Sequence, residues 1–168
     1  LIDIIRMGIP LPAGKFPNDL LDQFFDDLPF DDPAVLIHPG VGEDTAAVDI
    51  AGEDVLVLKS DPITFATDAI GEYAVLVNAN DIATAGAKPR WFLTTLLFPC
   101  GTLASEIWHT MTELQTICQK WGITLCGGHT EITDSVNRPV ITGMLAGTVL
   151  KQNLIDKRNM KTGDRVLL

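Results

Sequence analysis

The 168-residue sequence has little cysteine and lacks long apolar runs. Its three cysteines, Cys100, Cys118 and Cys126, are irregularly spaced, which argues against a disulfide framework and against a CxxC zinc motif. Cys126 and His129 bracket two glycines, but two ligands do not make a zinc site. No apolar run approaches the roughly 20 residues that a membrane-spanning helix needs. We therefore expect a soluble, cytoplasmic protein with no membrane partner.

Positive charge is also scarce. The chain has 12 Lys and Arg residues against 22 Asp and Glu residues, a formal net charge of −10. This balance argues against a nucleic-acid partner, because nucleic-acid phosphates require a basic protein face. The sequence begins at Leu1, and residues 165–168 resemble a strand that is cut short. We therefore expect a piece of a longer protein.

Residues 1–17 contain two glycines and three prolines, a composition that predicts a flexible N-terminal arm. The dipeptide Gly14-Lys15 is not a Walker A loop, because Phe16 stands where that motif requires Ser or Thr. A short helix is predicted to begin at Asn18, a good capping residue. The arm is therefore not expected to form a phosphate loop.

Beyond the arm, strand-like and helical segments alternate with hairpin-like pairs, which favours an α+β fold. The glycines of residues 40–45 lack the GxGxxG pattern and precede no helix, so a dinucleotide-binding fold is not supported. We predict strands over residues 35–38, 46–50, 55–60, 90–98, 123–126 and 140–150, and long helices over residues 69–85 and 103–121.

Four acidic residues stand out. Asp81 lies inside an otherwise small and apolar helix, where an unpaired carboxylate is costly to bury. Asp44 follows a glycine-rich turn, Asp61 is predicted to end the third strand before Pro62, and Glu131 follows Gly127-Gly128. Our hypothesis is that these carboxylates gather around Mg²⁺ and nucleotide phosphates.

Simpler interpretations of these acidic residues remain open. Asp44 fits a plain hairpin turn, and Asp61 fits a strand terminator. Asp68 is best explained as the N-cap of the long helix, without any ligand role. Each position alone is therefore weak support for a site.

Taken together, the motifs resemble a known family. They are Gly42-Glu-Asp44 with Ala46-Ala-Val48, Ser60-Asp61, Asn80-Asp81-Ile82 with Gly86-Ala-Lys-Pro89, and Gly127-Gly-His-Thr-Glu131. The family includes aminoimidazole ribonucleotide (AIR) synthetase, thiamine-monophosphate kinase, selenophosphate synthetase and the hydrogenase-maturation carbamoyl dehydratase. The combination looks closest to the hydrogenase-maturation, HypE-like branch.

The resemblance implies a PurM-like N-terminal domain over residues 18–150, with residues 151–168 starting a truncated C-terminal domain. It implies a mixed or antiparallel four-stranded sheet with helices on one face, and a homodimer in which the two sheets form a barrel. The implied cofactors are ATP and Mg²⁺. The implied ATP-binding residues are Asp44, Asp61, Asn80, Asp81, Gly127, Gly128, Thr130 and Glu131, and the implied metal ligands are Asp44, Asp61 and Asp81.

The activity that the resemblance implies is ATP-dependent phosphorylation of an amide- or acid-type oxygen, as in HypE-like dehydration or a related phosphoryl transfer. The acceptor would be a small molecule or a protein tail, and this piece alone is expected to be inactive. No catalytic residue is assigned. Two alternatives stay open: a non-catalytic, dimerising and nucleotide-sensing assembly module, and an ATP-dependent cyclo-ligase of the purine branch.

Overall fold

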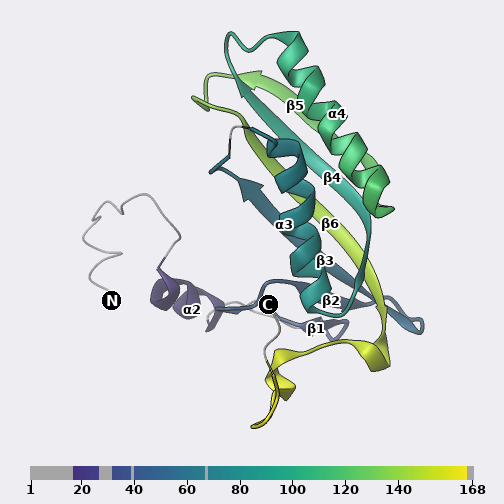
Figure 1. The fold of residues 1–168 in the computed structure, drawn as a ribbon. Coiled ribbons are helices and arrows are strands. Elements are labelled where there is room, and N and C mark those ends of the chain that lie inside the picture. Colours follow the sequence, from purple (N-terminus) through teal and green to yellow (C-terminus); the bar gives the residue numbers. More distant parts are fainter. Residues whose placement is uncertain (1–16, 27–31, 39, 67, 166–168) are drawn as a thin grey trace.

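The computed structural model describes residues 17–165 except 27–31, 39 and 67, so nearly all of the predicted N-terminal arm lies outside the described residues. Helices and strands are mixed along the chain, as predicted for an α+β fold (Figure 1). The elements are α2 (Asn18–Asp26), β1 (Val35–Ile37), β2 (Ala46–Asp49), β3 (Asp54–Ile63), α3 (Ile70–Thr84), β4 (Lys88–Pro99), α4 (Ala104–Trp121), β5 (Thr124–Thr133), β6 (Val140–Leu150), η1 (Lys151–Asn153) and η2 (Lys157–Asn159).

All the described strands belong to one sheet with the order β1-β2-β3-β6-β4-β5. Only the β4–β5 pair is parallel, and α4 provides the crossover between these two strands. The prediction of four strands was wrong. The β1–β2 hairpin extends the sheet, because β2 pairs along its whole length with β3, from Ala46 opposite Leu58 to Asp49 opposite Val55.

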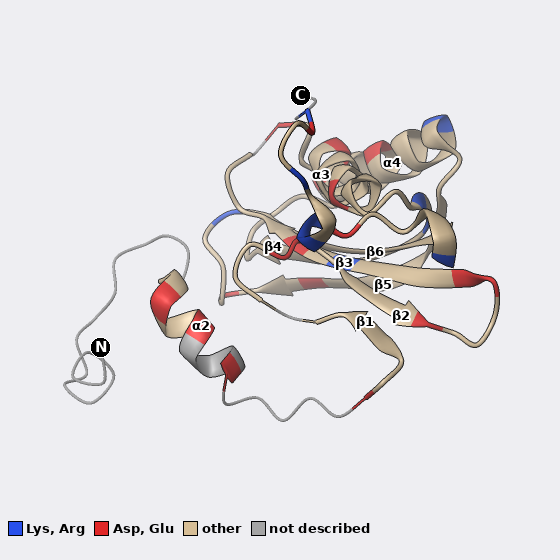
Figure 2. Ribbon diagram, turned by 90° about the horizontal axis from the view of Figure 1, so that it is seen from below, with Lys and Arg blue, Asp and Glu red and all other residues tan. Residues whose placement is uncertain are grey.

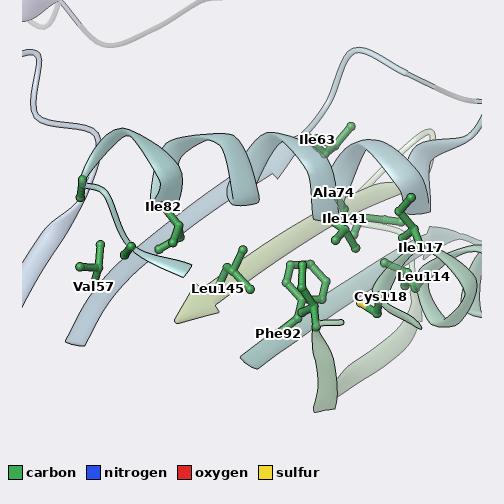
Figure 3. Close-up of a cluster of buried hydrophobic side chains, with 14 of the residues drawn as sticks. Val57, Ile63, Ala74, Ile82, Phe92, Leu114, Ile117, Cys118, Ile141 and Leu145 are labelled. Carbon is green, nitrogen blue, oxygen red and sulfur yellow. The ribbon is translucent and has the colours of Figure 1, made fainter. Parts of the chain in front are cut away.

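Helices α3 and α4 lie side by side on one face of this sheet (Figure 2). Glycines in the central strand β6 allow α3 to come close. A Cβ on Gly143 would lie 2.5 Å from Nδ2 of Asn78, and a Cβ on Gly147 would lie 2.6 Å from Cγ2 of Ile82. The core therefore forms directly between α3 and the strands, where Ile82, Phe92 and Leu145 are fully buried (Figure 3).

Three predicted element boundaries were wrong. Strand β3 does not end at Asp61 but continues through Pro62 to Ile63, with Asp61 paired to Gly143 of β6. The N-cap of α3 is Ala69, with φ of 50°, so Asp68 does not cap this helix. The strand predicted over residues 123–126 does not end at Cys126 but continues as β5 through Gly127 and Gly128 to Thr133.

In the described part of the chain, no helix covers the sheet face opposite α3 and α4, which we call the open face (Figure 2). Its side chains alternate with the buried ones, and several are large and apolar. Trp91, Leu93 and Met144 are 42%, 38% and 41% exposed. Among the described residues, no helix is both long and apolar enough to cross a membrane.

The segment after β6 folds back against the rest of the domain. The backbone N–H of Lys151 donates to the carbonyl of Glu53, and that of Ile155 donates to the carbonyl of Ala85. The guanidinium of Arg158 donates to the carbonyl of Leu36 at 3.1 Å. These bonds connect the segment to three different parts of the domain. The domain boundary at residue 150 stays a prediction.

Candidate acidic site around Lys59

The candidate site begins with two charged residues on strand β3. Side chains along a strand alternate between its two faces, so Val55, Val57, Lys59, Asp61 and Ile63 share one face. The two valines and the isoleucine are completely buried under the helices. Lys59 and Asp61 therefore lie on the helix-covered face, where an unpaired charge would be costly.

The partner of this pair comes from helix α3. Nζ of Lys59 lies 2.8 Å from Oδ2 of Asp81 and 3.6 Å from Oδ2 of Asp61. The side chain of Lys59 is only 15% exposed, and those of Asp61 and Asp81 are 38% and 25% exposed. One ammonium group thus lies between two carboxylates from different elements.

Asp44 approaches the same place from the loop between β1 and β2. Its charge contributes to the electrostatic environment of Lys59. The side chain of Asp44 is 56% exposed, and its Oδ2 lies 3.9 Å from Nζ of Lys157. Lys157 also lies 3.3 Å from Glu43 and donates to the carbonyl of Gly42, so the segment after β6 holds this loop.

The pKa of Lys59 is raised above its ordinary value. Burial lowers this pKa, but the hydrogen bond to Asp81 and the charges of Asp81, Asp61 and Asp44 together outweigh burial. The side chain of Lys59 is therefore a fixed positive charge at neutral pH. Its one positive charge acts on three neighbouring carboxylates, one of which, Asp44, also lies 3.9 Å from Lys157.

Asn78 lies one helical turn before Asp81 and is completely buried. Its Nδ2 donates to the carbonyl of Ala74 at 2.8 Å and to that of Asp61 at 3.4 Å. Its Oδ1 has no hydrogen-bond partner in the described part of the chain. A buried, unsatisfied amide oxygen is costly, and such groups are often found at functional sites.

The donor chemistry of these residues suits Mg²⁺, which prefers carboxylate oxygens and phosphates. Their present arrangement suits it less well, because within residues 17–165, apart from the gaps, no three His, Cys, Asp or Glu side chains are grouped closely enough to hold one ion. The ammonium of Lys59 lies between Asp61 and Asp81, where a cation would bind. A metal ion would therefore have to replace Lys59 as the partner of these carboxylates.

The other predicted ATP-binding residues are not part of this cluster. Asn80 is exposed on α3, whereas Asn78, two residues earlier, is the buried one. Asp61, Gly143, Thr94 and Gly128 are in register across four neighbouring strands. Three strand spacings of about 4.8 Å therefore place Gly128 about 14 Å from Asp61 in one chain.

The glycines of β5 have a structural role of their own. Gly127 and Gly128 have φ values of 143° and 154°, and a Cβ on Gly128 would lie 1.9 Å from the carbonyl oxygen of Thr94. Only glycine can therefore lie this close to β4. Glu131 was predicted to bind nucleotide. Its Oε2 lies 3.3 Å from Nε2 of His129, and both side chains are more than half exposed.

A groove of about 650 Å³ lies between α4 and β5. Trp108 and Met111 of α4 line one side, and Gly127, Gly128 and Thr130 of β5 line the other. This volume is within the range of small-molecule sites, which are usually apolar with a few polar groups. The structure thus places the predicted residues in two regions, the acidic cluster at α3 and the groove at α4.

Cys118 also lines the groove. Burial, followed by the neighbouring Cys126, raises the pKa of the Cys118 thiol to about 11. A thiol with this pKa stays protonated at neutral pH, and only the thiolate is a good nucleophile. Cys118 is therefore a packing residue of the groove wall.

Lys59 was not among the site residues predicted from the sequence. The signal was present in the segment Val55-Leu-Val-Leu-Lys-Ser-Asp61. In a strand every second side chain lies on the same face, so Lys59 and Asp61 share a face with the apolar Val55 and Val57. A lysine at a core-facing strand position needs a carboxylate partner, and Asp61 and Asp81 were both already candidates.

Known proteins are similar to this chain over the region that contains both the acidic cluster and the groove. The model of the family described as AIR synthase related protein, N-terminal domain, matches residues 42–149. A phosphoribosylformylglycinamidine cyclo-ligase from Magnetococcus marinus is 32% identical over 114 residues, which are 66% of this chain and 32% of the relative.

Two further matches are proteins named for hydrogenase formation or maturation. A protein of Methanocaldococcus jannaschii named for hydrogenase expression and formation is 24% identical over 140 residues, 79% of this chain and 42% of the relative. The crystal structure of hydrogenase maturation protein HypE in complex with ATP has a TM-score of 0.59 and 20% identity, and covers 90% of this chain and 45% of that one. The chain thus spans less than half the length of each of these three proteins.

Proposed function

Because this chain belongs to the AIR synthase related protein family, whose N-terminal domain it matches, we propose that it is the ATP- and Mg²⁺-binding domain of a longer, ATP-dependent enzyme. The observation that carries the proposal is that Lys59 lies between Asp61 of a strand and Asp81 of a helix, while the charge of Asp44 from a loop acts on the same lysine. Carboxylates from separate elements that share one place are typical of a functional site.

The proposed roles follow from the chemistry of the residues. Asp44, Asp61 and Asp81 would hold Mg²⁺, which when bound neutralises phosphate charge and orients the phosphates. The groove between α4 and β5 would take the nucleoside, with Thr130 and the backbone at Gly127 and Gly128 as polar contacts. Asn80 and Glu131 stay predicted ATP contacts.

In this proposal the complete enzyme phosphorylates an amide- or acid-type oxygen, as in a HypE-like dehydration or a related phosphoryl transfer. The Methanocaldococcus relative, named for hydrogenase expression and formation, and the HypE protein of the ATP complex, named for hydrogenase maturation, support this branch. The 32% identity to a cyclo-ligase supports the purine-branch alternative. The acceptor oxygen would come from a small molecule or from the tail of a protein.

A non-catalytic assembly module is a second candidate, and one observation favours it. The ammonium of Lys59 satisfies Asp61 and Asp81 from within the chain, so these carboxylates have a structural role that needs no ligand. Turnover of ATP by the full-length protein separates the two candidates. An enzyme loses turnover when Asp81 is replaced by Asn, whereas an assembly module shows no turnover to lose.

We also propose that the chain forms a homodimer through the open face of its sheet. Trp91, Leu93 and Met144 expose large apolar side chains there, and a contiguous apolar face of this kind usually has a partner. Pairing of two such faces would produce the barrel that the family resemblance implies. A cytoplasmic location is part of the same proposal.

Calorimetric titration of Mg·ATP into the full chain tests the proposed function. We expect saturable binding to the wild type and a loss of at least about tenfold in affinity for Asp81→Asn, because one charged ligand is removed. Asp68→Asn is the matched control, since Asp68 is exposed and lies just before the same helix. Equal affinity of Asp81→Asn and the control would refute the assignment of the site.

A further inference from the structure

We propose that Lys59 is an exchangeable internal cation: it neutralises Asp61 and Asp81 in the nucleotide-free chain, and it binds a phosphate oxygen once a divalent ion takes these carboxylates. This inference rests on the proposed function, and it assigns to the site a residue that sequence analysis left out. It also predicts that metal and lysine compete for the same oxygen atoms.

The first support is the position of the ammonium group. Nζ of Lys59 is 2.8 Å from Asp81 and 3.6 Å from Asp61, and its side chain is 15% exposed. A divalent ion held by these carboxylates would have to occupy the space that the ammonium now fills. Two cations cannot share that space, because like charges repel strongly in a partly buried site.

The second support is charge balance. Lys59 and Lys157 offer two positive charges to the four carboxylates of Glu43, Asp44, Asp61 and Asp81, which leaves the group negative. A divalent ion is therefore attracted to the cluster even when Lys59 is present. Its binding would free an ammonium group that must find another acceptor, because burial without a partner is costly.

The third support is the chemistry of the lysine side chain. Lysine has a flexible four-carbon stem and three rotatable donors, and it is a common ligand of phosphate groups. Lys59 extends from a strand that is paired on both sides, so its backbone is fixed and only its side chain would have to change rotamer to reach a new acceptor. A nucleotide phosphate that arrives with the metal ion is the nearest new acceptor of suitable charge.

The fourth support is Asn78, which lies against the same strand. Its Oδ1 is buried and has no partner in the described residues, while its Nδ2 donates to the carbonyl of Asp61. An unused acceptor beside a mobile ammonium or a hydrated metal ion would gain a donor when the cluster rearranges. Asn78 thus offers an acceptor that no described residue uses.

Titrations of Mn²⁺ alone and of Mg·ATP into the full chain test the inference, with the variants Lys59→Met and Lys59→Arg. For Lys59→Met we expect Mn²⁺ to bind at least about threefold more tightly, because the competing ammonium is gone, and Mg·ATP to bind about tenfold more weakly. Lys88→Met, an exposed lysine at the start of β4, is the matched control and should change neither affinity.

Lys59→Arg keeps the positive charge, and its planar fork pairs with carboxylates more firmly than an ammonium does. We expect this variant to have the thermal stability of the wild type and to bind Mn²⁺ more weakly. Lys59→Arg therefore keeps the inference testable if Lys59→Met does not fold.

The outcomes separate the inference from the proposed function. If the wild type binds Mg·ATP and Lys59→Met binds both ligands with wild-type affinity, Lys59 is only a structural ion-pair partner and the inference is wrong. If Lys59→Met weakens the binding of Mn²⁺ and Mg·ATP alike, metal and lysine do not compete, and the inference is again wrong. If the wild type binds neither ligand, the proposed function fails and the inference fails with it.

Discussion

Nζ of Lys59 lies 2.8 Å from Oδ2 of Asp81, which joins the central sheet to helix α3 by an ion pair with side chains 15% and 25% exposed. This contact explains how an acidic residue can lie on the inner side of an otherwise apolar helix. It also links the stability of the fold to the electrostatics of the proposed nucleotide site. The first two predictions follow from this link.

Replacement of Asp81 by Asn should destabilise the nucleotide-free chain. Lys59 would then keep only the more distant Asp61 as a partner, and loss of one member of a largely buried ion pair leaves the other uncompensated. We expect the free energy of unfolding to fall by about 1–3 kcal/mol, measured by urea denaturation. Asp68→Asn should change it by less than about 0.5 kcal/mol, as exposed substitutions usually do. Equal unfolding midpoints for both variants would show that the ion pair contributes nothing.

The raised pKa of Lys59 predicts how stability depends on pH. Its ordinary value is 10.5, and the folded-state value is higher. The stabilisation is therefore fully present below about pH 10.5 and is lost as the pH rises through the folded-state pKa. The wild type should show a steeper loss of thermal stability than Lys59→Met between about pH 10 and pH 12. Parallel curves for the two proteins would contradict this assignment.

Gly143 should tolerate no side chain. A Cβ at this position would lie 2.5 Å from Nδ2 of Asn78 and 2.7 Å from the ring of Phe92, so α3 would be pushed away from the sheet. We expect Gly143→Ala to lower the free energy of unfolding by about 1–3 kcal/mol, the usual range for overpacking. Gly52→Ala is the control, because the atom nearest to a Cβ added at Gly52 is 4.0 Å away. Equal stability of the two variants would mean that α3 does not need this close approach.

The open face of the sheet should mediate dimer formation. Met144 is 41% exposed on this face, and Met160 is 68% exposed after η2. We expect sedimentation to show a dimer for the wild type and for Met160→Glu, and a monomer for Met144→Glu, because a charge would be buried in the interface. Both variants should stay folded, since neither side chain is in the core. A dimer that persists in Met144→Glu would place the interface elsewhere.

The family and much of the fold could be predicted from the sequence. Four weak motifs in the right order predicted the family, and the match over residues 42–149 confirms it. Periodicity located the long helices, and the predicted strand over residues 140–150 coincides with β6. All six predicted strand segments belong to the sheet. The prediction of four strands was wrong because it was taken from the family resemblance and not from these six segments.

The arrangement of the site was harder to predict, for physical reasons. Glycine usually marks a turn, but Gly127 and Gly128 lie in a strand because the backbone of Thr94 leaves no room for a Cβ on Gly128. Strand register decides which motifs meet, and it depends on pairings across the whole chain. The sequence therefore predicted that Asp61 and Gly128 belong to one nucleotide site, whereas three strand spacings separate them in one chain.

Asp44 offers the most direct test of the central claim that this domain binds Mg·ATP through its acidic cluster. Its side chain is 56% exposed and its ion pair with Lys157 is long, 3.9 Å, so Asp44→Asn should leave the stability of the fold nearly unchanged. The measurement is a calorimetric titration of Mg·ATP into the wild type, Asp44→Asn and Asp68→Asn. We predict saturable binding to the wild type and to Asp68→Asn, and at least about tenfold weaker binding to Asp44→Asn. Wild-type affinity in Asp44→Asn, or no binding to any of the three proteins, would contradict the claim.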